Sequence, residues 1–122
     1  MKFSMPQYCG NSPRMQVVAG FARAWGEADT EFFDRWFVEE PQWEPAAKGN
    51  GDSAATPGLP LRGDLSELEI LAVVTHGKYG AVDGTATTKD GERFGFAHLL
   101  EFTSAAKSGK VEVVRTYIVP GD

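Results

Sequence analysis

The stretch FGFAHLLEF, Phe94 to Phe102, alternates in a way that decides the local fold. Phe94, Phe96, His98, Leu100 and Phe102 stand at every second position, so in a β-strand they share one face of the sheet. Four of these side chains are apolar and predict a buried face. The central imidazole must find a partner there, so His98 is either a bonded core residue or a polar group of a pocket.

The second half of the chain continues this β pattern on both sides of that stretch. The runs LEILAVVTHG, YGAVDGTATTKD, ERFGFAHLLEFTSA and KVEVVRTYIV are rich in β-branched and aromatic residues. Asp90-Gly91 separates two of them, and an Asp-Gly pair between strand-like runs is typical of a hairpin. The sequence therefore predicts an antiparallel meander of about four strands.

The first half predicts two helices. Ser12 and Pro13 provide a cap and a first-turn proline, apolar residues then recur at three- and four-residue steps, and Gly26 is the expected stop. Asp29 is expected to cap a second helix, TEFFDRWFVEE, which Pro41 ends, and QWEP is a candidate short strand. Helices followed by a meander predict an α+β fold with the helices on one face of a curved sheet.

Length and composition narrow the class of protein. The 122 residues predict one domain over 1–122, with a flexible, glycine- and proline-rich loop at 45–64. A net charge of −5 without basic runs argues against nucleic acid as a partner. No apolar run reaches the roughly 18 residues of a membrane span, and the first residues do not resemble a signal peptide. Together with the single cysteine, Cys9, this predicts a cytoplasmic protein.

Other candidate residues are weaker than His98. His76 is expected at a solvated strand end, and two histidines with one cysteine at no ligand spacing predict no metal site and no cofactor. Cys9 precedes a helix start but has no local base. Glu39, Glu40 and Glu44 form a carboxylate cluster that is either an acid–base site or a wet charged rim.

The segments WGEADTEFFDRWFVEEPQWEP and FAHLLEFTSAAKSGKVEVVRTYIV, with the order of elements, resemble the nuclear transport factor 2-like superfamily. The similarity runs from Ser12 to Val119 and is strongest for its SnoaL-like and ketosteroid-isomerase-like branch. It implies a cystatin-like, cone-shaped, mostly antiparallel sheet around N-terminal helices, an apolar cavity at the open end, and a homodimer through the outer sheet face. It also implies a third helix within residues 45–64, where this chain has breakers instead.

The resemblance does not carry over the ketosteroid isomerase residues. That enzyme uses an Asp base with a Tyr and a protonated Asp as donors. The tyrosine position falls on Phe21, the base falls on Pro45 beside Glu44, and the protonated aspartate falls on His98. The chain is therefore not expected to be a ketosteroid isomerase by that mechanism.

The same alignment directs His98 into the cavity, with small Gly84 and Ala86 leaving room beside it. It gives the following pocket residues: Phe21, Trp25, Trp43, Phe96, Val114, Thr116 and Ile118.

Three functions follow from these residues. The first is a pocket for an apolar small molecule, with His98 as donor or base and, if catalytic, an isomerase- or cyclase-type proton transfer on a carbonyl compound. The second is a non-catalytic ligand-binding dimer, and the third is a protein-interaction module. An open cavity with an unpaired His98 favours the first, an open cavity with a satisfied His98 the second, and an interior filled by Trp and Phe the third.

Overall fold

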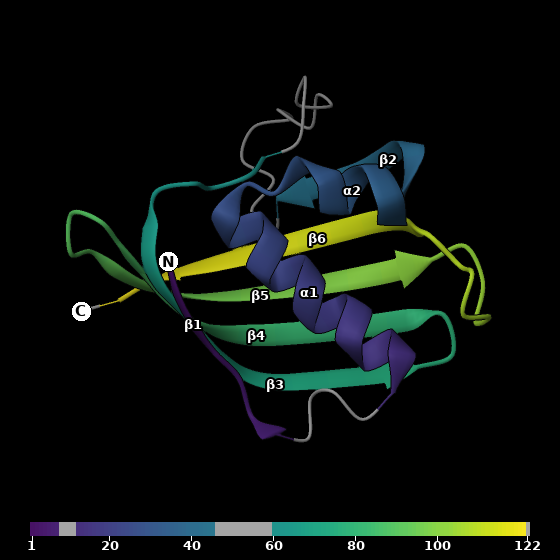
Figure 1. Ribbon diagram of the computed structural model, residues 1–122, viewed down its shortest axis with the longest axis horizontal. Coiled ribbons are helices and arrows are strands. Elements are labelled where there is room, and N and C mark those ends of the chain that lie inside the picture. The colour runs from purple at the N-terminus through teal and green to yellow at the C-terminus, as the bar shows by residue number, and fades with distance from the viewer. Residues whose placement is uncertain (8–11, 46–59, 122) are drawn as a thin grey trace.

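A computed structural model describes residues 1–7, 12–45 and 60–121, and in it two helices lie on one face of a six-stranded, mostly antiparallel sheet (Figure 1). The helices are α1 (Pro13–Glu27) and α2 (Thr30–Trp36). The strands are β1 (Lys2–Ser4), β2 (Phe37–Pro45), β3 (Leu65–His76), β4 (Tyr79–Thr88), β5 (Arg93–Phe102) and β6 (Val111–Pro120).

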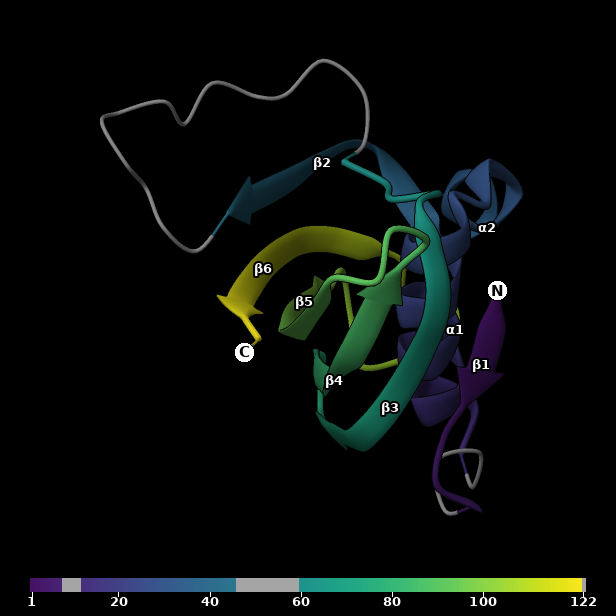
Figure 2. The ribbon, with the colours of Figure 1, turned by 90° about the vertical axis from the view of Figure 1, so that its left-hand side faces the viewer.

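The predicted meander is confirmed. The strand order is β1-β3-β4-β5-β6-β2, and the four strands from β3 to β6 pair antiparallel with their sequence neighbours. Two parallel edge strands complete the sheet: β2 pairs with β6, and the short β1, which the sequence pattern does not reveal, pairs with β3. Figure 2 shows the strands bending so that the sheet curves beside the helices.

Helix α1 begins as predicted but ends later. The Ser12 side chain accepts a hydrogen bond from the Met15 amide, and Pro13 lies in the first turn. The predicted stop at Gly26 is wrong, because the helix continues to Glu27 and Ala28 caps it in the left-handed conformation. Gly26 is instead a close-packing position, where a Cβ atom would lie 2.8 Å from Leu68 of β3.

Helix α2 is shorter than predicted. It ends at Trp36, and Phe37 already pairs with Val111 of β6, so Pro41 lies within strand β2 and does not end the helix. The register shifts between Phe37 and Gln42, which gives this edge strand an irregular segment able to accommodate a proline. The expected strand at QWEP lies within β2.

The core lies between α1 and the concave side of the sheet. Helix α1 packs chiefly on β3 and β4, and it contributes buried Val18, Phe21, Ala22 and Trp25. The predicted inward row of β5 is buried throughout, from Phe94 to Phe102 at alternate positions. Neither helix of the described chain is long and apolar enough to cross a bilayer.

The predicted loop at 45–64 is only partly described. Residues 46–59, and with them the position of the expected third helix, lie outside the described residues. Residues 60–64 are fixed against α1, since the Arg62 amide donates to the Trp25 carbonyl and the Gly63 amide to the Gly26 carbonyl. The flexibility of the loop at 45–64 stays a prediction, and Gly63 adopts a φ of +81° in the described part.

Candidate functional site

His98 lies on the inner face of β5 with 1% of its surface exposed. Its ring centroid is 4.5 Å from that of Trp25 and 4.8 Å from that of Phe21, and both contacts are edge-to-face. Phe96, its neighbour in the inward row, lies 5.4 Å away. The imidazole is therefore enclosed by aromatic rings of α1 and β5.

One nitrogen of the imidazole is bonded and the other is not. Nδ1 lies 2.9 Å from Oγ1 of Thr116 on the adjacent strand β6. The same hydroxyl oxygen accepts a 2.7 Å hydrogen bond from Nε1 of Trp43 on β2. Nε2 is buried without a hydrogen-bond partner in the described chain. Leaving such a group unpaired costs roughly 1–3 kcal/mol, and an edge-on contact with an aromatic face recovers only part of this.

Burial also fixes the charge of the ring. Removal from water disfavours the imidazolium, and this lowers the pKa of His98 from 6.5 to about 3. The ring is neutral at neutral pH. A neutral imidazole with so low a pKa is a weak general base, but it still offers a hydrogen-bond donor to an oxygen atom.

The room expected beside Gly84 is filled. A Cβ atom there would collide with the Glu69 carbonyl oxygen and would lie 2.9 Å from Cζ of Phe96. The small residue therefore admits the close approach of the β3 main chain at Glu69 and of the Phe96 ring. The expectation of space at this position is wrong, because the absent side chain is replaced by protein atoms.

Open space lies further along the same inner face, at the end formed by the β4–β5 turn and the end of β6. A hollow of about 460 Å³ is lined there by Arg62, Thr88, Gly91, Glu92, Arg93, Phe94, Ile118, Pro120 and Gly121. Phe94 is its apolar wall, and the Arg62 guanidinium lies 4.8 Å above that ring. The size is within the usual range of small-molecule sites, about 300–1,000 Å³.

Trp25 and Phe96 separate this hollow from His98. The Trp25 ring packs on Phe94, Phe96 and His98 in turn, with centroid distances of 6.5, 5.3 and 4.5 Å. Phe94, Phe96 and His98 are consecutive members of the inward row of β5. The Trp25 ring therefore links Phe94, in the wall of the hollow, to the His98 ring.

The predicted pocket residues fall into two groups. Six of them lie in the interior around His98: Phe21, Trp25, Phe96 and Val114 are buried, while Trp43 and Thr116 are half-buried. Ile118 is 45% exposed and lies in the wall of the hollow, because α1 does not extend over this end of β6.

The other candidates do not join this site. Glu44 pairs in register with Arg115 on β6, while its neighbour Trp43 points inward and bonds to Thr116, so strand alternation turns the carboxylate away. Glu39, Glu40 and His76 are exposed, and Cys9 lies outside the described residues. Across residues 1–7, 12–45 and 60–121, no three His, Cys, Asp or Glu side chains gather closely enough to hold a metal ion.

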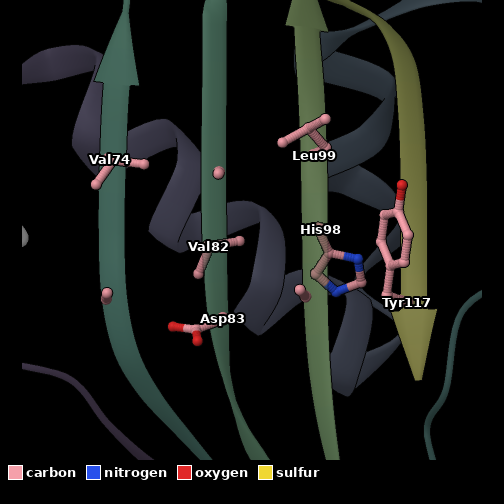
Figure 3. A pocket seen from close by; sticks show the side chains of 9 residues that line it. Val74, Val82, Asp83, His98, Leu99 and Tyr117 are labelled. Carbon is pink, nitrogen blue, oxygen red and sulfur yellow. The ribbon is translucent and has the colours of Figure 1, made fainter. Parts of the chain in front are cut away.

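The outer face of the sheet carries a second, shallow pocket of about 220 Å³ (Figure 3). Its rim includes Val74, Leu99 and Tyr117, large apolar side chains that are 62%, 37% and 42% exposed. Alanines on three neighbouring strands make its floor, and Asp83 is its acidic side chain. This face is apolar at its centre although it lies in solvent.

Two features of the site escape sequence reasoning. Arg62, in the wall of the hollow, comes from a segment whose composition predicts only a loop. Its guanidinium donates two hydrogen bonds, of 2.9 and 3.0 Å, to the carboxylate of Asp64, two residues along the chain. The Trp43–Thr116 bond joins residues 73 positions apart through the parallel pairing of β2 with β6. In the sequence, the one indication of this hydrogen bond is that the polar Thr116 stands between the inward residues Val114 and Ile118.

Comparison of this chain with protein-family models, curated proteins and solved structures found no match.

Proposed function

We propose that this chain binds an apolar small molecule bearing a carbonyl or similar oxygen, and that His98 donates a hydrogen bond to that oxygen from Nε2. The observation that carries the proposal is the unpaired Nε2, a polar atom held at the centre of an aromatic interior. Buried polar groups are normally satisfied, so an orphan atom at this place supports a partner outside the described residues, which the proposal takes to be a ligand.

The interior around His98 is filled by aromatic side chains, which by the criterion given above favours a protein-interaction module. A small-molecule site therefore requires an entrance to the imidazole, and the hollow beside Phe94 is that entrance in this proposal. Its apolar wall continues the inward row of β5 toward His98, and only Trp25 and Phe96 intervene. Rotation of the Trp25 side chain, which lies at the carboxyl end of α1, brings a ligand in the hollow within reach of the imidazole. Aromatic walls and one placed polar group are the usual composition of a small-molecule site.

Binding is favoured over turnover. An isomerase- or cyclase-type reaction needs a base as well as a donor, and His98, with a pKa of about 3, is poorly suited to remove a proton. The polar side chains bonded around the ring in the described chain are those of Thr116 and Trp43, neither of which titrates near neutral pH. Glu44, a member of the predicted carboxylate cluster, lies on the opposite face of β2 from Trp43.

The proposal is tested with a pair of probes of matched shape. Acetophenone carries a carbonyl oxygen, whereas α-methylstyrene replaces it with a methylene group. Because one hydrogen bond contributes about 1 kcal/mol, the wild-type protein should bind acetophenone roughly five-fold more tightly, as measured by NMR titration. The His98→Phe variant, which keeps an aromatic ring of similar size, should lose the preference for acetophenone and favour α-methylstyrene, because the buried carbonyl oxygen then lacks a donor.

His76→Phe is the matched control, since this histidine is exposed at the end of β3, and it should keep the wild-type preference. Equal affinity of the wild-type protein for the two probes, or an unchanged preference in His98→Phe, would refute the donor role.

We also propose that the fold is the cone-shaped, nuclear transport factor 2-like arrangement of the SnoaL-like branch, and that a second copy of the chain covers the outer sheet face. The order of two helices, a strand and a curved meander supports the first part. The exposed apolar side chains Val74, Leu99 and Tyr117 support the second, because a patch of this kind on a sheet is typical of an interface. Residence in the cytoplasm stays a prediction from the single cysteine.

A further inference from the structure

The Thr116 hydroxyl stands between two nitrogen atoms of different character. The indole Nε1 of Trp43 is always a donor, so the 2.7 Å contact requires the Thr116 oxygen to accept. The hydroxyl proton then needs an acceptor of its own. Among the described residues, the atom in position to accept it is Nδ1 of His98, at 2.9 Å.

The two tautomers of neutral His98 differ in how many polar functions they leave unpaired. If Nδ1 accepts from Thr116, every function in the chain of bonds is used and only the N–H at Nε2 lacks a partner. If Nδ1 instead donates to Thr116, the hydroxyl proton and the Nε2 lone pair both lack partners. The first arrangement leaves fewer polar functions of the described chain unpaired and is therefore the more stable.

We propose that Thr116 is a specificity-determining residue: its hydroxyl, oriented by Trp43, holds His98 as the tautomer protonated at Nε2, so that the interior selects ligands with a hydrogen-bond acceptor. The inference rests on the proposed function of His98 and extends it to the class of ligand. Ketones, esters and other compounds with an accepting oxygen are bound, whereas hydrocarbons of the same shape bind more weakly.

The position of Thr116 supports this role over simple packing. It lies on β6 between Val114 and Ile118 in the inward row, where valine would fill a similar volume. Trp43 reaches it from β2, whose parallel pairing brings residues 43–45 alongside residues 114–116. Trp43 on β2 thus orients the Thr116 hydroxyl on β6, and this hydroxyl in turn orients the imidazole.

The first test examines the free protein, without a ligand. The ¹⁵N chemical shifts and two-bond couplings of the His98 ring distinguish a protonated from an unprotonated nitrogen. The wild-type protein and Thr116→Ser should show a protonated Nε2 and a bare Nδ1 from pH 5 to pH 8. Thr116→Val and Thr116→Ala should show a mixture of tautomers or the opposite one, because Nδ1 loses its donor.

If the His98 ring of the wild-type protein is protonated at Nδ1, that result alone overturns the inference, and no variant is needed. An unchanged tautomer in both Thr116→Val and Thr116→Ala would also overturn it. The alanine variant keeps the experiment informative if the valine variant does not fold.

The second test measures the ratio of acetophenone to α-methylstyrene affinity in the same variants. The ratio should fall toward one in Thr116→Val and stay within about two-fold of wild type in Thr116→Ser, which keeps the hydroxyl. If the wild-type protein shows no preference, the proposed function fails, and ligand selection fails with it even where the tautomer is as expected. If the preference exists but Thr116→Val retains it, only the role of Thr116 is overturned.

Discussion

The rings of Trp25 and His98 lie 4.5 Å apart with their planes at 76°, and the same Trp25 ring packs on Phe94, which lines the hollow. Trp25 comes from the last turn of α1, and its main-chain carbonyl is bonded to the Arg62 amide. A single side chain therefore joins the helix end, the wall of the hollow and the buried imidazole.

The buried imidazole makes stability depend on pH. In the unfolded chain His98 takes up a proton below about pH 6.5, whereas in the folded protein its pKa is about 3. Between these values the unfolded state binds more protons, so stability is complete above pH 6.5 and falls as the pH drops. This linkage predicts that His98 lowers the free energy of unfolding by about 2 kcal/mol between pH 7.5 and pH 5, and urea unfolding measures this change.

The His98→Phe variant should lose most of that pH dependence, since phenylalanine does not titrate. His76→Phe, at an exposed position, should behave like the wild-type protein. If His98→Phe loses as much stability at pH 5 as the wild-type protein does, the imidazole is not held neutral by burial.

The close approach of β3 to Gly84 on β4 leaves no room for a side chain. We expect Gly84→Ala to lower the free energy of unfolding by about 2 kcal/mol or more, because the new Cβ atom would collide with the Glu69 carbonyl oxygen and press on Phe96. Gly95→Ala is the matched control on the next strand, where the nearest atoms lie at 3.8 Å or beyond, and it should change stability by no more than about 0.5 kcal/mol. Equal effects in urea unfolding would contradict the close approach.

The outer face predicts self-association. If a second copy covers it, Val74→Glu or Leu99→Glu places a charge in an apolar contact and should convert a dimer to a monomer without loss of fold. Sedimentation velocity gives the mass, and circular dichroism checks the fold. Lys107→Glu, exposed in the β5–β6 loop, should leave the dimer intact. A wild-type protein that is monomeric at high micromolar concentration would remove this part of the proposal.

Local patterns predicted most of the elements because the properties that form them are local. The Ser12-Pro13 start of α1, the Asp90-Gly91 turn and the period-two alternation of β5 each act within a few residues. The predictions are wrong where contacts with residues distant in the sequence determine how an element ends or what a residue does. Gly26 packs on Leu68, and Phe37 enters a strand because β6 pairs with it. Strand β1 is three residues long and carries no periodicity to detect.

The sequence by itself determined that residue 98 faces inward, because alternation assigns a side chain to one side of a strand whatever the neighbouring strands are. Only the tertiary structure decided what the imidazole meets there: Thr116 on one nitrogen, aromatic rings around the other, and open space displaced to the mouth of the sheet. The reason is physical, since packing and hydrogen bonding depend on which strands and helices come together, and the contact between Phe21 and His98 joins residues 77 positions apart.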